Sequence, residues 1–231
     1  MRSYPGYAPQ YYSIKQQGIP GSLMGRTMGF LIFYIGIFAA VAYGSLFVIY
    51  SGYYGIISMV GLVFLFGGYF AQRFTLRRGG ALSAVLGAVV AIGAGMVSGP
   101  FVAGYAIYQP GIFISSMTIL VLTFIACALV VSVTKFDFTR IWPLLYVGLF
   151  GLIIVTFLSF FLAPLVGVVT SPLFNILGVI IFTGYLLVNF SIMKYRDTNL
   201  PVNTLSAVLA TRILINLINL LMFLLSLGRR R

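Results

Sequence analysis

The chain has 231 residues, of which 61% are hydrophobic and 7% charged, and its mean hydropathy is +1.11. This composition excludes a soluble globular protein and is typical of a polytopic membrane protein. Fourteen Lys and Arg residues outnumber the two acidic residues, Asp137 and Asp197, so the net charge is +12. Because the basic residues cluster at the ends of apolar segments, they indicate contact with anionic lipids of the bilayer and control of topology, and no nucleic-acid partner is expected.

Residues 1–26 include Tyr, Pro, Gln and Gly and contain no apolar run after the first basic residue. They therefore lack the pattern of a cleavable signal peptide. We expect a flexible cytoplasmic N-terminal arm, residues 1–26, followed by one transmembrane domain, residues 27–231.

Seven apolar segments approach the length of about 20 residues that a helix needs to cross a bilayer. The predicted fold is therefore all-α, a polytopic membrane protein with seven transmembrane helices. The third segment is rich in glycine and alanine, which indicates close packing, because small residues let helix backbones approach each other. Pro100 and Pro110 predict a loop between the third and fourth segments. The predicted ranges are Met28–Tyr50, Gly55–Gln72, Ala81–Ser98, Ile112–Val133, Ile141–Leu162, Leu173–Met193 and Leu205–Leu227.

The basic residues lie in alternate connections, before the first segment and after the second, fourth and sixth. They are Arg2, Lys15 and Arg26; Arg73, Arg77 and Arg78; Lys135 and Arg140; Lys194 and Arg196. By the positive-inside rule, the N-terminus and these connections face the cytoplasm of a multi-pass protein, which we expect in the cell membrane. Seven crossings then place Arg229, Arg230 and Arg231 outside, against the rule. Either this tail is a tolerated exception or the last segment does not fully cross; the length of the segment favours the full crossing.

The last apolar segment differs from the others because it carries Arg212, Asn216 and Asn219. Their spacing of four and three residues places them on one face of a helix. A charged side chain near mid-bilayer costs about 2.5–3.5 kcal/mol, so this face is expected to look toward protein or a water-filled cavity, with other helices around it. The alternative is structural: an asparagine often only bonds a neighbouring helix, for about 0.6 kcal/mol, and Arg212 can extend toward the interface.

Residues for catalysis or metal binding are scarce. The sequence contains no His and no Glu, and its one cysteine, Cys127, lies in an apolar segment. Ser-His and Cys-His pairs are therefore excluded, and the two aspartates lie in predicted loops rather than facing each other in the membrane. A Ser-Lys dyad is not excluded by count, but Lys135 and Lys194 lie at helix ends, where a lysine stays charged. We expect no enzyme, no metal site and no cofactor.

A loop after the fourth segment resembles that of a known family. The stretch Val133–Arg140 (VTKFDFTR) contains Thr134, Lys135 and Asp137 in the order of a Thr-Lys-x-Asp loop, and Gly148–Ile154 (GLFGLII) follows it. Both resemble the Bax inhibitor-1 family, the transmembrane Bax inhibitor motif proteins.

The end of the chain shows the same resemblance. Phe182–Asn189 is similar to the sixth helix of that family, and Ile213–Leu221 is similar to its seventh. The similarity extends over most of the chain from about Arg26, although its specific motifs occupy the second half.

The resemblance implies a fold in which three helix pairs surround a central seventh helix. It also implies a calcium leak channel gated by pH through two aspartates, one on each of the last two helices. At the matching positions this chain has Asn189 and Asn216, whereas Asn219 keeps the family residue. A carboxylate pair can share a proton and so respond to pH, but an amide pair cannot titrate. Calcium also prefers charged oxygen ligands, and Arg212 adds a positive charge nearby.

The expected function is therefore that of an ion leak channel or transporter, for calcium or another ion, with a non-titratable polar gate of Asn189, Arg212, Asn216 and Asn219. At 1.5 Å per residue, Asn189 lies roughly 6 Å and Arg212 roughly 10 Å from the cytoplasmic ends of their helices. A hydrogen bond between these two would form a closed latch that is insensitive to pH. Two alternatives stay open: a non-conducting regulator or scaffold of membrane protein partners, and a path for anions attracted by Arg212.

Overall fold

The computed structural model describes residues 21–49, 53–75, 80–159, 161–162, 167–195 and 201–229. Within them, seven helices are long and apolar enough to cross a membrane, which confirms the predicted all-α architecture. A short 3-10 helix, η1 (Phe138–Ile141), leads into the fifth of them. The seven are α1 (Gly21–Ile49), α2 (Tyr54–Phe74), α3 (Gly80–Tyr108), α4 (Pro110–Val133), α5 (Trp142–Ser159), α7 (Pro172–Tyr195) and α8 (Val202–Gly228).

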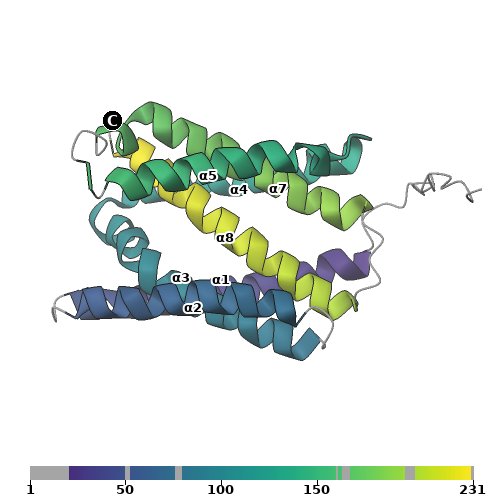
Figure 1. Ribbon diagram of the computed structural model, residues 1–231, viewed down its shortest axis with the longest axis horizontal. Coiled ribbons are helices and arrows are strands. Elements are labelled where there is room, and N and C mark those ends of the chain that lie inside the picture. The colour runs from purple at the N-terminus through teal and green to yellow at the C-terminus, as the bar shows by residue number, and fades with distance from the viewer. Residues whose placement is uncertain are drawn as a thin grey trace, which may run out of the picture.

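The helices form two groups with α8 between them (Figure 1). α1, α2 and α3 lie on one side, α4, α5 and α7 lie on the other, and α8 crosses obliquely between the groups. α8 packs against α1, α3, α4 and α7. In an apolar stretch of α8, 67% of the residues are buried, compared with 11% in α2 and 11% in the span of η1 and α5. The seventh span is therefore the centre of the bundle, as its polar residues predict.

Contacts within the first group centre on α3. This helix packs along both α1 and α2, whereas α1 and α2 barely touch each other. In the second group α7 has the corresponding place, because it contacts α4, α5 and α8. The first three spans therefore form one group around α3.

Glycines on two faces of α3 explain this arrangement. A Cβ atom on Gly93 would lie 2.6 Å from the carbonyl oxygen of Gly61 in α2, and one on Gly99 would lie 2.6 Å from the Cα atom of Ala42 in α1. No side chain fits at such distances, so glycine is what lets these backbones approach. The close packing predicted for the third segment is confirmed.

α1 begins earlier than the sequence predicts, at Gly21 instead of Met28. Its first turns are held by tertiary contacts, because Leu23 is buried in the core and the Arg26 guanidinium donates to the side-chain oxygen of Asn203 at the start of α8. The last part of the predicted arm, residues 21–26, is therefore helical, and residues 1–20 lie outside the described residues.

α3 is also longer than predicted, because it continues through Pro100 to Tyr108. A proline inside a helix removes one backbone hydrogen bond and bends the helix. Figure 1 shows the last part of α3 turning toward the second group. Pro100 and Val102 are buried there, so tertiary packing offsets the missing hydrogen bond.

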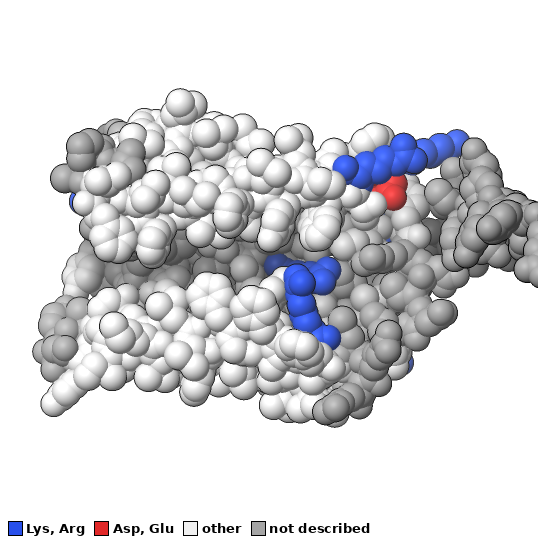
Figure 2. All heavy atoms as spheres, viewed as in Figure 1, with Lys and Arg blue, Asp and Glu red and all other residues white. Residues whose placement is uncertain are grey.

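Basic side chains gather at one end of the bundle, which we call the basic end. It holds the starts of α1, α3 and α8 and the ends of α2 and α7, with Arg26, Arg73, Lys135, Arg140 and Lys194. On the face drawn in Figure 2, the charged side chains lie mainly in this half, and apart from a small basic patch at the opposite end the remaining described surface is uncharged. Such a surface suits the hydrocarbon of a bilayer.

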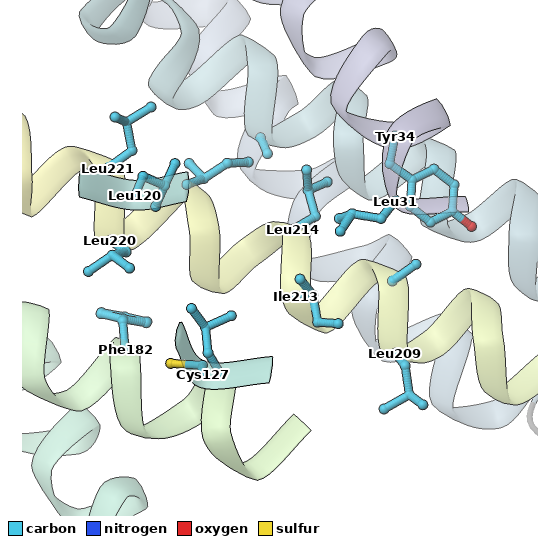
Figure 3. Packing of buried hydrophobic residues seen from close by; sticks show 14 of the residues in the cluster. Leu31, Tyr34, Leu120, Cys127, Phe182, Leu209, Ile213, Leu214, Leu220 and Leu221 are labelled. Carbon is cyan, nitrogen blue, oxygen red and sulfur yellow. The ribbon is translucent and has the colours of Figure 1, made fainter. Parts of the chain in front are cut away.

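The apolar core surrounds α8 (Figure 3). Leu31 and Tyr34 of α1 lie on one side of it, and Cys127 of α4 and Phe182 of α7 lie on the other. All four side chains are buried. The core thus joins both helix groups through the central helix.

Candidate functional site

Two buried asparagines lie on the helices that form the centre of the bundle. Asn189 on α7 is 4% exposed and Asn216 on α8 is 8% exposed, and these two helices pack against each other. Burying an amide in apolar surroundings costs free energy unless its hydrogen bonds are made. The centre of the bundle is therefore not a purely apolar core.

One strip of α8 is only half-buried, although the helix is central. Its members are spaced by three or four residues and so share one face: Arg212, Ile215, Asn219, Met222 and Ser226. Figure 2 shows the molecule hollowed between its two halves, with basic side-chain atoms in the hollow. Arg212 and Asn219 thus lie on the least covered side of α8, while Asn216 lies toward the interior.

Hydrogen bonding at this polar face is partly local. The Asn219 Nδ2 atom donates to the carbonyl oxygen of Ile215, 2.8 Å away in the same helix. Arg212 has an interaction partner in the protein. Among the hydrogen bonds of the described residues, none joins Asn189 to Asn216. The Arg212–Asn189 latch therefore stays a prediction.

Leucines follow the polar face of α8 toward the end opposite the basic end. Leu220, Leu221, Leu224 and Leu225 are each less than 10% exposed. Figure 3 shows Leu220 directed toward Phe182 of α7 and Leu221 on the other side of the helix. A tightly packed apolar layer excludes water, and hydrated ions do not pass such a layer.

A second polar cluster, which the sequence did not predict, links α1, α2, α3 and α8. Gln72, 2% exposed near the end of α2, donates through Nε2 to the Ser83 carbonyl oxygen (2.9 Å) and to Thr211 Oγ1 (3.0 Å). The Tyr34 hydroxyl donates to the Ala84 carbonyl oxygen (3.0 Å). Because Thr211 precedes Arg212 in α8, the hydrogen bonds of this cluster hold the central helix in place next to the predicted gate residue Arg212.

The predicted loop motif caps helices at the basic end. The Asp137 carboxylate accepts hydrogen bonds from the backbone N–H (2.9 Å) and the hydroxyl (2.7 Å) of Thr139 and so begins η1. The Thr134 carbonyl oxygen accepts from Lys194 Nζ (2.8 Å), which also binds two further carbonyl oxygens in the last turn of α4. A cation stabilises a helix C-terminus. Lys135 is exposed, so only the other two motif residues form these contacts.

The side-chain oxygen atoms at the centre of the bundle, which could contact a cation, are uncharged. Within the described residues, no group of three or more His, Cys, Asp or Glu side chains could hold a metal ion. Amide and hydroxyl oxygens can contact a passing cation, but they bind calcium less strongly than carboxylates do. The polar face is thus suited to transient contact and not to tight binding.

Seven apolar helices, of which the central one carries buried polar side chains, define an integral multi-pass membrane protein. The chain matches the model of a family described as inhibitor of apoptosis-promoting Bax1 over residues 21–230. It belongs to this family, the Bax inhibitor-1 family, which confirms the resemblance of its loop and last two helices. None of the curated proteins matches it.

Proposed function

We propose that the protein is a passive ion pathway, a leak channel or transporter, in which polar residues of α7 and α8 form the gate. The observation that carries this proposal is the burial of Asn189 and Asn216 on the two central helices. Polar side chains inside a membrane are costly and often line an ion path. Membership of the family supports the same function, because the resemblance implies a calcium leak channel.

The gate has two parts in series. From the basic end, an ion first meets the polar face with Arg212, Asn216 and Asn219, and then the leucine layer that begins at Leu220. The polar face replaces part of the hydration shell, while the leucine layer blocks passage until α8 moves relative to α7. Opening therefore requires the contact between Leu220 and Phe182 to separate.

This gate does not titrate in the physiological pH range. The positions that match the family's aspartates hold amides, the chain contains no histidine, and an arginine stays protonated in proteins. Ion flux is therefore expected to be the same at pH 6 and pH 8.

Calcium flux into dye-loaded proteoliposomes tests the proposal. Wild-type protein is expected to leak equally at pH 6 and pH 8, whereas Asn189→Asp/Asn216→Asp acquires pH dependence, because two carboxylates can share a proton. Asn175→Asp is the matched control, since Asn175 is also buried on α7 but bonds the Ser171 carbonyl oxygen near the start of that helix. Wild-type flux no greater than that of empty liposomes at either pH contradicts the proposal.

A non-conducting regulator or scaffold of membrane partners is the second candidate. The closed leucine layer and the local hydrogen bond of Asn219 favour it, because both suit a purely structural core. Arg212→Leu separates the candidates: it changes ion flux if the polar face conducts, and changes only stability if it does not. Chloride flux without calcium flux would instead support a path for anions.

Chemistry and charge support two further parts of the proposal. The lack of His and Glu indicates that the protein is not an enzyme. The basic end, by the positive-inside rule, faces the cytoplasm together with the N-terminus. We further propose that this membrane is the cell membrane.

A further inference from the structure

The outer side of the bundle carries a recess between α5 and α7. Its volume is about 460 Å³, and its walls come from Ile141 of η1, Leu144 and Leu145 of α5, and Val179, Thr183 and Leu187 of α7. Leu144 is 73% exposed, so the recess faces outward. It is apolar apart from Thr183, and α8 does not contribute to it.

A glycine lowers the floor of this recess. A Cβ atom on Gly184 would lie 2.6 Å from Leu145 Cδ2, so α5 and α7 are close there and leave a furrow on their outer side. Along α7 the furrow extends from Val179 to Leu187, eight residues or about 12 Å. One leaflet of a bilayer is roughly 15 Å thick, half of the 30 Å hydrocarbon core. The length of the furrow is therefore close to the thickness of one leaflet, which a single acyl chain spans.

The mouth of the recess is basic. Ile141 lines it, and its neighbour Arg140 is exposed at the basic end, as is Lys135 in the same connection. The one acidic side chain of that connection, Asp137, accepts two hydrogen bonds from Thr139. Two positive charges against one negative charge leave this mouth attractive to an anion.

Aromatic side chains mark the same level of α5. Trp142 is 50% exposed and Tyr146 is 57% exposed, and their ring centroids are 6.0 Å apart. Tryptophan and tyrosine are enriched where a membrane protein meets the headgroup region. The mouth of the recess thus lies at headgroup level, with the apolar furrow below it.

We propose that this recess binds one anionic phospholipid, with an acyl chain in the furrow and its phosphate beside Arg140. The apolar lining matches an acyl chain, and an arginine fork matches phosphate oxygens. A neutral lipid fits the furrow equally well but gains less from the basic mouth. The site is independent of whether the protein conducts ions.

Trp142 is the only tryptophan of the chain and reports on this site directly. Phospholipids with brominated acyl chains quench tryptophan fluorescence on contact. The two brominated lipids are compared at equal mole fractions in the vesicles. Brominated phosphatidylglycerol is expected to compete for contact with Trp142 about fivefold better than brominated phosphatidylcholine. A basic residue near the surface contributes about this factor.

Two variants locate the effect. Arg140→Ala is expected to bring the ratio of quenching by the anionic lipid to quenching by the neutral lipid close to one. Arg73→Ala removes an exposed arginine from the end of α2 in the other helix group and is expected to leave this ratio unchanged. Thr183→Phe fills the furrow and keeps Trp142 unique; it is expected to reduce quenching by the anionic lipid. Circular dichroism checks that each variant is folded.

Four results overturn the proposal. Equal quenching by both lipids in the wild type shows no anionic site, and equal losses in Arg140→Ala and Arg73→Ala show only general surface charge. Reversal of quenching by millimolar inorganic phosphate shows a free-anion site rather than a lipid site. Weak quenching by every brominated lipid shows that protein, such as a second copy, covers the recess.

Discussion

Gln72 shows how one buried amide can connect three helices in a membrane protein. Its Nε2 atom bonds α3 through the Ser83 carbonyl and α8 through Thr211. Hydrogen bonds between membrane helices contribute about 0.6 kcal/mol on average, so the contribution of each is modest. The main effect of these bonds is on geometry, because they fix the rotation of α8 about its axis next to Arg212.

Removing the Thr211 hydroxyl tests this role. Thr211→Val deletes the acceptor of Gln72 and the donor to the Ala207 carbonyl with little change in shape. We expect a loss of about 0.6 kcal/mol, because only the bond to Gln72 joins two helices, and a melting temperature lower by about 1–2 °C. Thermal unfolding in nanodiscs measures it. Thr118→Val is the control, since that exposed hydroxyl bonds only its own helix, and equal effects of the two variants would contradict the role of the cluster.

The polar residues differ in how far the sequence reveals them. Arg212 stands out because a charge inside an apolar segment has no ordinary place in lipid, and burial of Asn216 agrees with that argument. Gln72 does not stand out, because it lies at the end of an apolar segment, where polar residues normally meet water. Only the tertiary contact of α2 with α3 and α8 shows that it is buried. The bonds of Asn189 likewise depend on helix rotation, which the sequence does not specify.

α3 is the element whose packing depends most on residue size. Gly87 lies against Tyr34, and a Cβ atom there would be 2.7 Å from Thr211 Oγ1. Gly104 of the same helix has no atom within 4 Å of an added Cβ. The two glycines therefore form a matched pair, one at a three-helix contact and one in open space.

Alanine substitution is expected to have opposite effects at these two positions. Gly87→Ala forces Tyr34 or Thr211 to move within a packed core and should cost about 1–3 kcal/mol. Gly104→Ala should stabilise α3 by about 0.5–1 kcal/mol, because alanine favours a helix interior. Chemical unfolding in mixed micelles compares them, and a similar gain in stability for both would mean that helix propensity, not close packing, decides.

Lys194 connects two elements by capping α4 from the end of α7. Lys194→Met removes the cation from three carbonyl oxygens, at a cost of about 1 kcal/mol. The last turn of α4 should then fray, and hydrogen exchange of its amides should rise about fivefold. Lys135→Met is the control, since that exposed side chain lies in the same connection. An unchanged exchange rate in Lys194→Met would show that the cap is not needed.

The sequence predicts a helix boundary well where the helix ends at a local break in the chain. It predicts the boundary less well where tertiary contacts extend the helix. α4 and α7 begin and end within two residues of the prediction. α1 is extended by the contact of Arg26 with Asn203, and α3 continues through Pro100 because the surrounding helices bury it. Such long-range contacts leave no local pattern in the chain.

At the scale of the whole molecule, α8 determines the architecture and the number of crossings. Its 27 residues are about 40 Å long, more than the roughly 30 Å of the hydrocarbon core. It starts beside Arg26 at the basic end, and a Cβ atom on Gly228 at its other end would lie 2.5 Å from Ile112 at the start of α4. The helix therefore extends through the full bundle, which supports a complete crossing in spite of its basic tail.

Cysteine labelling from the two sides tests this orientation. The wild-type protein serves as its own blank, since its one cysteine, Cys127, is 4% exposed. With a membrane-impermeant maleimide, Lys135→Cys should react only in inside-out vesicles and Arg229→Cys only in right-side-out vesicles. The positive-inside rule predicts that the basic loops lie in the cytoplasm, and an odd number of crossings would separate them from the tail. Labelling of both variants from the same side would show that α8 does not cross, and labelling from the reversed sides would show that the basic end faces outward.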